Sequence, residues 1–145
     1  IQTWGATKVS VVNQLPKTWK LIASSNGNEI YSVDQAENYP WYGFIYESDK
    51  LAGSSMYFTD QYFDNHNFKG YVAERYTEVG REGNEITYVN GATRATATTA
   101  CVVEYDSTED VWSATYMPVD HLTKAGNGNA TVAASKALLK KALNK

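Results

Sequence analysis

The feature that most constrains this chain is a regular alternation of strand-like runs with short clusters of turn-forming residues. Aromatic and β-branched residues fill the runs, and Gly, Asn, Asp, Ser and Pro fill the clusters. Asn26-Gly27 separates the runs at 19–23 and 29–33, and Asn-Gly favours a tight hairpin because both residues tolerate positive φ. The sequence therefore predicts an antiparallel meander rather than β-α-β units.

The same pattern continues to residue 117, with further turn clusters at 48–53, 64–67, 80–84 and 106–110. We expect about eight strands, at 19–23, 29–33, 41–46, 55–63, 70–77, 85–89, 93–105 and 111–117. A meander of this size buries its edges most simply by closing on itself. The sequence therefore predicts an all-β fold, an antiparallel up-and-down barrel, with a two-sheet β-sandwich as the alternative.

Helical periodicity is confined to the C-terminus. Residues 130–143 are rich in Ala, Leu and Lys, and Val132, Leu138, Leu139 and Leu143 fall near one stripe. We expect a C-terminal α-helix over 130–143 that docks on the sheet. The chain has 145 residues, the size of one domain, so we expect a single domain over 1–145 with an N-terminal segment at 1–18.

The run at 41–46 carries apolar or aromatic residues on both faces of the expected strand. Trp41 and Ile45 alternate with Tyr42, Phe44 and Tyr46. A strand of this kind needs a second layer over its outer side. We expect a helix, a terminal segment or a partner protein to supply that layer.

Charge and cysteine content exclude several classes of protein. The formal net charge is -3, the pI is near 5.3 and Lys and Arg are not clustered, which argues against a nucleic-acid partner. No apolar run approaches the roughly 20 residues of a membrane span. Cys101 is the only cysteine, so an internal disulfide and a multi-cysteine zinc site are excluded. Its apolar surroundings indicate an inert core thiol.

The start of the chain and the order of its elements carry a resemblance to a known family. Leu15-Pro16-Lys17-Thr18-Trp19 leads into the first strand, and the meander and the C-terminal helix follow. This order resembles the lipocalins and the wider calycin group over most of the chain. The resemblance implies a barrel that carries a small ligand, and a late-strand arginine, Arg94 or Arg75, packed on the tryptophan. Lys17 stands where the family has a glycine, and the opening also resembles that of small exported proteins of lactic-acid bacteria.

Aromatic residues make up 13% of the chain, and 11 of them are tyrosines. Tyrosine combines an apolar face with a polar tip, which suits half-wet pockets and interfaces. We expect cross-strand core packing to take most of these residues. The densest cluster exceeds what one core face can absorb, and a second pair forms the expected opposite wall. The predicted ligand-binding residues are Tyr39, Trp41, Tyr42, Tyr46, Tyr57, Tyr62, Trp112 and Tyr116.

Catalytic patterns are sparse. His66 and His121 each have an aspartate close by in sequence, Asp64 and Asp120, which could orient an imidazole as a base. We expect both to be solvated loop histidines, because adjacency along the chain does not give hydrogen-bond geometry. We predict no catalytic residue, no metal site and no cofactor.

These observations predict a carrier rather than an enzyme. The chain begins at Ile1 rather than Met, which favours a processed, exported protein, secreted or at the cell surface. We expect it to hold a small hydrophobic or amphipathic ligand in an aromatic-lined barrel. The alternatives are an extracellular interaction or carbohydrate-binding module that uses the same tyrosines, and a small-barrel enzyme with a histidine base. A homodimer is left open.

Overall fold

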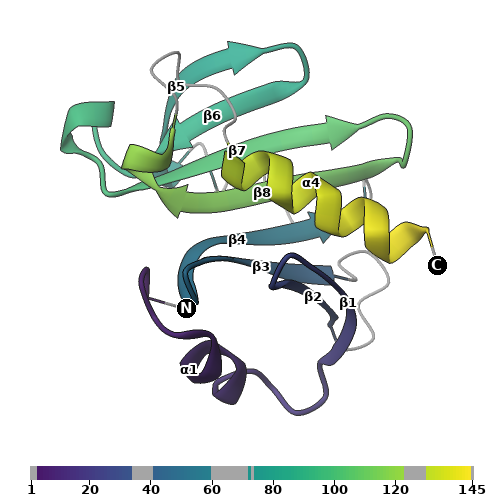
Figure 1. Ribbon diagram of the computed structural model, residues 1–145. Coiled ribbons are helices and arrows are strands. Elements are labelled where there is room, and N and C mark those ends of the chain that lie inside the picture. Colours follow the sequence, from purple (N-terminus) through teal and green to yellow (C-terminus); the bar gives the residue numbers. More distant parts are fainter. Residues whose placement is uncertain (1–2, 34–40, 60–71, 73, 123–129, 145) are drawn as a thin grey trace.

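The computed structural model describes residues 3–33, 41–59, 72, 74–122 and 130–144. Eight strands form one antiparallel sheet (Figure 1), which confirms the all-β class and the expected number of strands. The strands are β1 (Lys20–Ser25), β2 (Asn28–Ser32), β3 (Trp41–Glu47), β4 (Lys50–Phe58), β5 (Thr77–Glu82), β6 (Glu85–Val89), β7 (Thr99–Asp106) and β8 (Val111–Pro118). The described chain also contains the helices α1 (Lys8–Asn13) and α4 (Ala130–Leu143) and the short 3-10 turns η1 (Arg94–Thr96) and η2 (Val119–His121).

The strand order is β1-β2-β3-β4-β8-β7-β6-β5, so two four-stranded meanders meet where β4 pairs with β8. That pairing runs from Ser54 opposite Tyr116 to Phe58 opposite Trp112. β1 and β5 are the two edges, and the sheet is not closed into a barrel in the part of the chain that the structure describes. A simple up-and-down barrel would place β5 beside β4. Here β8 takes that position, and added layers rather than closure bury the sheet.

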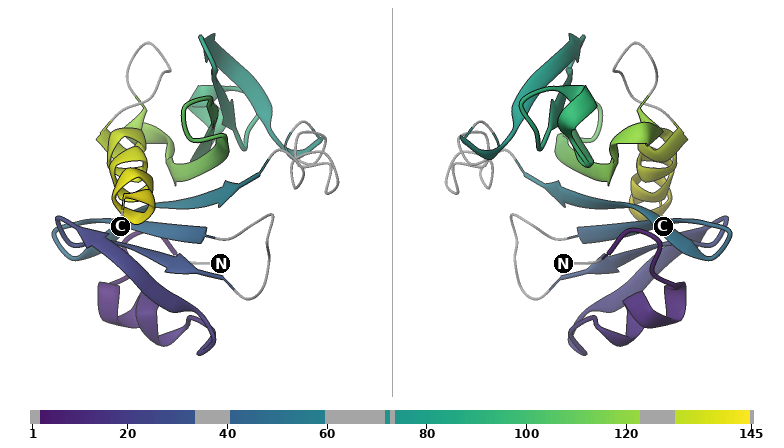
Figure 2. Two further views of the ribbon diagram at one scale, coloured as in Figure 1. Left: turned by 90° about the vertical axis from the view of Figure 1, so that its right-hand side faces the viewer. Right: turned by 90° about the vertical axis from the view of Figure 1, so that its left-hand side faces the viewer.

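Those layers lie on opposite sides of the first meander. In Figure 2, α4 lies on one face of β1–β4 and α1 on the other. The alternation of β3 divides accordingly: Trp41 and Ile45 pack in the cluster that includes Leu138 of α4. Tyr42 and Phe44 pack in the cluster that includes Val11 of α1. The N-terminal segment and α4 therefore supply the layers that a strand apolar on both faces requires.

The N-terminal segment is tied to the sheet by backbone hydrogen bonds. Gly5 N donates to Leu51 O at 2.9 Å, and Leu51 N donates to Ala6 O at 2.8 Å. The Thr7 hydroxyl then caps α1 by accepting from Ser10 N. These contacts place Val11 of α1, which is fully buried, against the outer face of β3 and β4.

Several expected boundaries are corrected. Of the strand expected at 93–105, residues 94–96 form η1 and β7 begins only at Thr99, and β5 extends into the turn expected at 80–84. The turn expected at 48–53 is confined to Ser48 and Asp49, both at positive φ, and β4 begins at Lys50. Of the strand expected at 70–77, the structure describes residues 72 and 74–77, and among these Val72 lies in a helical turn and only Thr77 belongs to a strand, β5. Val72 is 1% exposed. A valine can be buried equally well in a helical turn and in a strand, so the apolar pattern does not distinguish the two.

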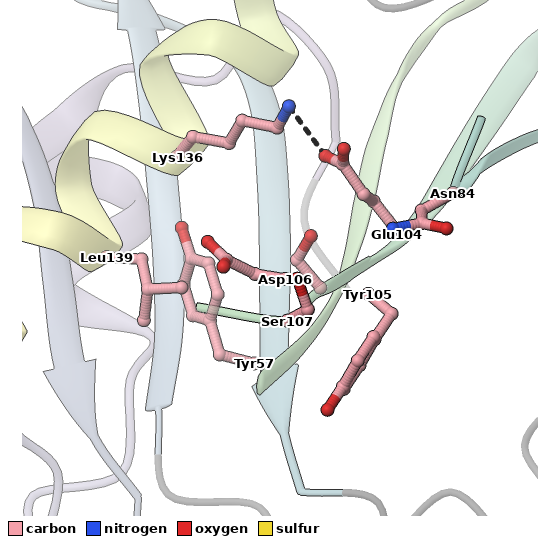
Figure 3. Close-up of a pocket in the computed structure, with 9 residues that line it drawn as sticks. Tyr57, Asn84, Glu104, Tyr105, Asp106, Ser107, Lys136 and Leu139 are labelled. Carbon is pink, nitrogen blue, oxygen red and sulfur yellow. Dashed lines mark ion pairs between the residues drawn. The ribbon is translucent and has the colours of Figure 1, made fainter. Parts of the chain in front are cut away.

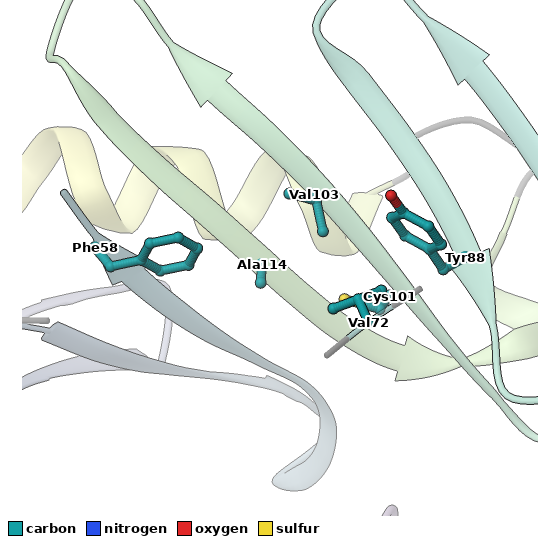
Figure 4. Close-up of a cluster of buried hydrophobic side chains, with 6 residues drawn as sticks. All are labelled: Phe58, Val72, Tyr88, Cys101, Val103 and Ala114. Atoms are coloured by element: carbon teal, nitrogen blue, oxygen red, sulfur yellow. The ribbon is translucent and has the colours of Figure 1, made fainter. Parts of the chain in front are cut away.

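The second meander, β5–β8, has its own apolar core on the face that points away from α4. Figure 4 shows the side chains converging from β4, β6, β7 and β8 on one cluster. Its buried members are Phe58, Val72, Tyr88, Cys101, Val103 and Ala114. Cys101 is completely buried, and burial raises the pKa of its thiol to about 12. The geometry thus agrees with an inert core thiol.

The native protein is expected to resist alkylation of Cys101 by iodoacetamide at pH 8.5. Its raised pKa keeps the thiol protonated there, and the thiolate is the reactive form. Mass spectrometry should show one added label only after unfolding in guanidinium chloride. Labelling of the folded protein at the rate of the unfolded chain would show that the thiol is accessible.

Candidate functional site

α4 approaches the sheet closely because small residues line the contact. Gly53 of β4 has no side chain, and an added Cβ would lie 2.4 Å from Thr131 Cγ2 of the helix. Beside it, Ser55 Oγ lies 2.6 Å from Ser135 Oγ and 3.2 Å from Thr115 Oγ1. Thr115 Oγ1 also donates to Ser135 Oγ at 3.1 Å. These buried hydroxyls therefore satisfy one another beneath the helix.

Tyr57 extends this hydroxyl cluster toward the C-terminal half of the helix. Its Oη donates to the Ser135 carbonyl oxygen at 2.8 Å and lies 2.8 Å from Ser135 Oγ. The side chain is fully buried, and burial raises the pKa of its phenol to about 12. Tyr57 therefore stays a neutral donor over the physiological pH range and fixes the height of α4 above β4.

Tyr57→Phe is expected to lower the free energy of unfolding by about 1 kcal/mol, because the hydrogen bonds to Ser135 are lost. Tyr46→Phe is the matched control, since the Tyr46 hydroxyl is buried without a hydrogen-bond partner among the described residues. That control should leave the free energy of unfolding unchanged or raise it by up to about 1 kcal/mol. Urea denaturation measures both, and equal losses would contradict the assigned hydrogen bonding.

A pocket of about 240 Å³ opens beside this cluster, between α4 and the β7–β8 hairpin (Figure 3). The hairpin, the β5–β6 turn and the inner face of the helix contribute its lining. The lining residues are Tyr57, Asn84, Glu104, Tyr105, Asp106, Ser107, Ser113, Lys136 and Leu139. Most of these carry polar or charged groups, so the pocket is polar, with Leu139 and Tyr57 as apolar members.

Charges of opposite sign meet in this pocket. Glu104 and Asp106 stand two residues apart on β7, and thus on the same face of the strand. Lys136 Nζ of α4 lies 2.7 Å from Glu104 Oε1. Figure 3 shows this ion pair bridging the helix and the strand, with the Tyr105 ring directed away from Lys136. The ion pair joins α4 to the second meander.

A second hollow of about 240 Å³ adjoins the pocket along the helix. It shares Asp106, Lys136 and Leu139 with the first and adds Thr108, Glu109 and Lys140. The turn orients Asp106, because Asp106 Oδ1 accepts hydrogen bonds from Thr108 N at 2.9 Å and Glu109 N at 3.1 Å. The two hollows make one groove along α4.

The structure divides the predicted aromatic site residues between the two faces of the sheet. Trp41 and Tyr57 lie in the cluster beneath α4. Tyr42 and Tyr46 pack against the N-terminal segment. Trp112 and Tyr116 pack on the outer face of the second meander. Tyr57 alone of these six lines the pocket, and Tyr39 and Tyr62 lie outside the described residues.

Several of these aromatic rings pack on one another. Tyr42 lies 5.5 Å from Trp19 and 5.2 Å from Phe44 between ring centroids. Tyr116 lies 6.4 Å from Tyr76. Burial raises the pKa of both Tyr42 and Tyr116. In the described chain these tyrosines form cross-strand and interlayer contacts of the core.

The charged members of the pocket were not among the predicted site residues. The signal that could have revealed them is the spacing of Glu104 and Asp106 after an apolar strand, which places two carboxylates on one face. Lys136 lies more than 30 residues further along the chain, so its approach to Glu104 depends on where α4 docks.

Of the two histidines, the structure describes only His121. His121 lies in η2, with Nδ1 3.4 Å from Thr131 Oγ1, and His66 lies outside the described residues. The described residues hold no group of three or more His, Cys, Asp or Glu side chains that could bind a metal ion.

None of the helices described is long and apolar enough to cross a membrane.

Comparison of the chain with protein-family models, curated proteins and solved structures gives no match. The lipocalin resemblance therefore stays a prediction. Function has to be inferred from the geometry of the pocket.

Proposed function

We propose that the chain is a small-molecule binding protein whose site is the pocket between α4 and the β7–β8 hairpin. The observation that carries the proposal is the lining of this pocket. Ligand sites in proteins are concave and combine an apolar wall with a few polar groups that fix orientation. Here Leu139 and the buried Tyr57 form the apolar side of the lining, and Glu104, Lys136 and Asn84 are among the polar groups.

The proposed role is still that of an exported carrier, as expected from the sequence. The proposed ligand site, however, is the pocket beside α4 rather than the aromatic cluster. The aromatic residues form parts of the two layers' cores, so they support the scaffold around the site. The ligand is then chosen by polar and charged contacts rather than by aromatic stacking.

Native mass spectrometry of protein purified without denaturation tests the proposal. We expect a reproducible small-molecule adduct that disappears in Ser113→Phe, because the new ring fills the pocket. Ser24→Phe is the matched control, since Ser24 is exposed on β1 and outside the pocket, and it should keep the adduct. An adduct retained in Ser113→Phe would place the ligand elsewhere.

A second candidate, a surface interaction module, is favoured by apolar side chains near the β1 edge. Val9 is 67% exposed, Val12 37% and Leu21 51%. Leu21 pairs with Tyr31, which packs with Val11, so Leu21 lies on the same face of the sheet as α1. An open strand edge beside apolar residues is a common protein-binding surface. Sedimentation analysis of wild type and Leu21→Lys would reveal self-association through this edge.

A further inference from the structure

The pocket presents binding groups for both a cation and an anion side by side. Glu104 and Asp106 come from β7, and Lys136 comes from α4, with Lys136 Nζ 2.7 Å from Glu104 Oε1. Lys140, one helical turn after Lys136, lines the adjoining hollow together with Asp106. Two carboxylates therefore face two ammonium groups along the groove.

Glu104 is largely shielded from water, whereas its partner Lys136 is half exposed. The Glu104 side chain is only 21% exposed, and Lys136 is 50% exposed. A ligand that covers the pair removes more of its water, which is costly unless each charge stays paired. A ligand of one charge would pair with Glu104 or with Lys136 and leave the other without a partner. A ligand with both charges pairs with each of them.

We propose that this pocket binds a small zwitterion of the amino-acid type, with its ammonium group on Glu104 and its carboxylate on Lys136. This inference rests on the proposed function and specifies the ligand class of the same site. In an α-amino acid the two charges flank one carbon atom. The molecule can therefore lie alongside the ion pair, with each of its charges next to the opposite charge of the protein.

The rest of the lining fits a ligand of this class. The volume of about 240 Å³ lies below the roughly 300–1,000 Å³ of sites for drug-sized molecules, which favours a ligand of few atoms. Leu139 and the fully buried Tyr57 form the apolar side of the pocket, so a ligand side chain would meet only a small apolar surface there. Ser107, Ser113 and Asn84 add hydroxyl and amide groups for further hydrogen bonds.

Titrations of the full chain with matched probes, followed by ¹H–¹⁵N correlation spectra at low salt, test the inference. The probes are the common L-amino acids, the amine and the carboxylic acid derived from the tightest of them, and glucose and glycerol as neutral compounds. The backbone amides of Glu104, Ser107 and Lys136 should shift with at least one amino acid. That amino acid should bind at least about tenfold more tightly than its amine or its acid, because each of those leaves one charge unpaired.

Variants of the charged pair supply an independent test. Glu104→Gln and Lys136→Gln should each weaken binding of that amino acid at least about tenfold. Lys141→Gln is the matched control, because Lys141 is exposed on the same helix and lines neither hollow, and it should leave the affinity unchanged. The spectra also report whether each variant folds. The comparison of probes on the wild-type protein needs no variant.

Three results would overturn the zwitterion assignment: equal affinity for the amino acid and for either singly charged analogue, tighter binding of glucose or glycerol, or no shift of the pocket amides with any amino acid. The small-molecule function is tested separately by the native mass adduct and its loss in Ser113→Phe. A neutral adduct lost in Ser113→Phe would uphold that function and reject the zwitterion. The absence of both adduct and amide shifts would reject both.

Discussion

Leu138→Ala is expected to lower the free energy of unfolding by about 2–5 kcal/mol. Leu138 is fully buried at the centre of α4 and packs in one cluster with Ile30, Ile45 and Tyr57. An added Cβ on Gly43 would lie 3.6 Å from Leu138 Cδ1, which shows how closely the helix fits β3. Truncation leaves a cavity that the side chains of the sheet beneath the helix fill only in part. Urea or thermal denaturation followed by circular dichroism measures the loss.

Lys141→Ala is the control for this substitution on the same helix. Lys141 is exposed, so its truncation should change the free energy of unfolding by no more than about 0.5 kcal/mol. If Leu138→Ala cost as little as Lys141→Ala, α4 would not be part of the cooperative core. The pocket would then lack one fixed wall.

Gly53→Ala is expected to cost about 1–3 kcal/mol through overpacking. The added Cβ would lie 2.4 Å from Thr131 Cγ2 and 3.2 Å from the Tyr116 backbone oxygen. The first contact requires α4 to move away from β4. Movement of this end of the helix would also strain the hydrogen bonds of Ser135 to Ser55. Denaturation curves and the amide shifts of α4 would report the change.

Thr131→Ser is the designed suppressor, because it removes Cγ2 and keeps the hydroxyl. The double variant Gly53→Ala with Thr131→Ser should recover much of the lost stability, leaving a residual cost from the Tyr116 contact. A double-mutant cycle measures this coupling. Strictly additive effects would mean that the glycine is not required by the approach of the helix.

Both substitutions bear on function because α4 forms one wall of the pocket. Lys136 and Leu139 of this helix line the pocket, and Leu138 and Thr131 hold the helix at its height above the sheet. A variant that shifts α4 should therefore change the distance between Lys136 and Glu104. The proposed binding and the stability of the protein should therefore both depend on how α4 docks on the sheet.

Local features of the fold could be predicted because they depend on neighbouring residues. Asn26 and Gly27 adopt φ of 53° and 84°, as expected for a tight hairpin turn between β1 and β2. The helix expected at 130–143 coincides with α4. The alternation at 41–46 indicated two buried faces, and the structure buries both.

Short helices could not be predicted in the same way. α1 has six residues, too few to be stable without tertiary contacts. Val72 lies in a helical turn within a stretch expected to be a strand. A buried apolar residue fits either structure, so the sequence pattern alone could not distinguish them.

The candidate site escaped prediction for a related reason. The aromatic count suggested one wall of rings, but the strand alternation sends Trp41 and Tyr42 to opposite faces. Which aromatic residues share a surface depends on the order of the strands. The charged groups of the pocket come from β7 and α4, and only the docked helix brings Lys136 to Glu104.

The strands other than β5, most of the turns and α4 could be predicted from the sequence, because turn sterics and the periodicity of burial act within a few residues. Three features appear only in the folded structure: β8 lies between β4 and β7, the sheet formed by the described strands is open, and opposite charges meet beside α4. The physical reason is that a strand with two apolar faces can pair with several neighbours. The choice among them depends on which arrangement lets α4 and the N-terminal segment cover both faces at once.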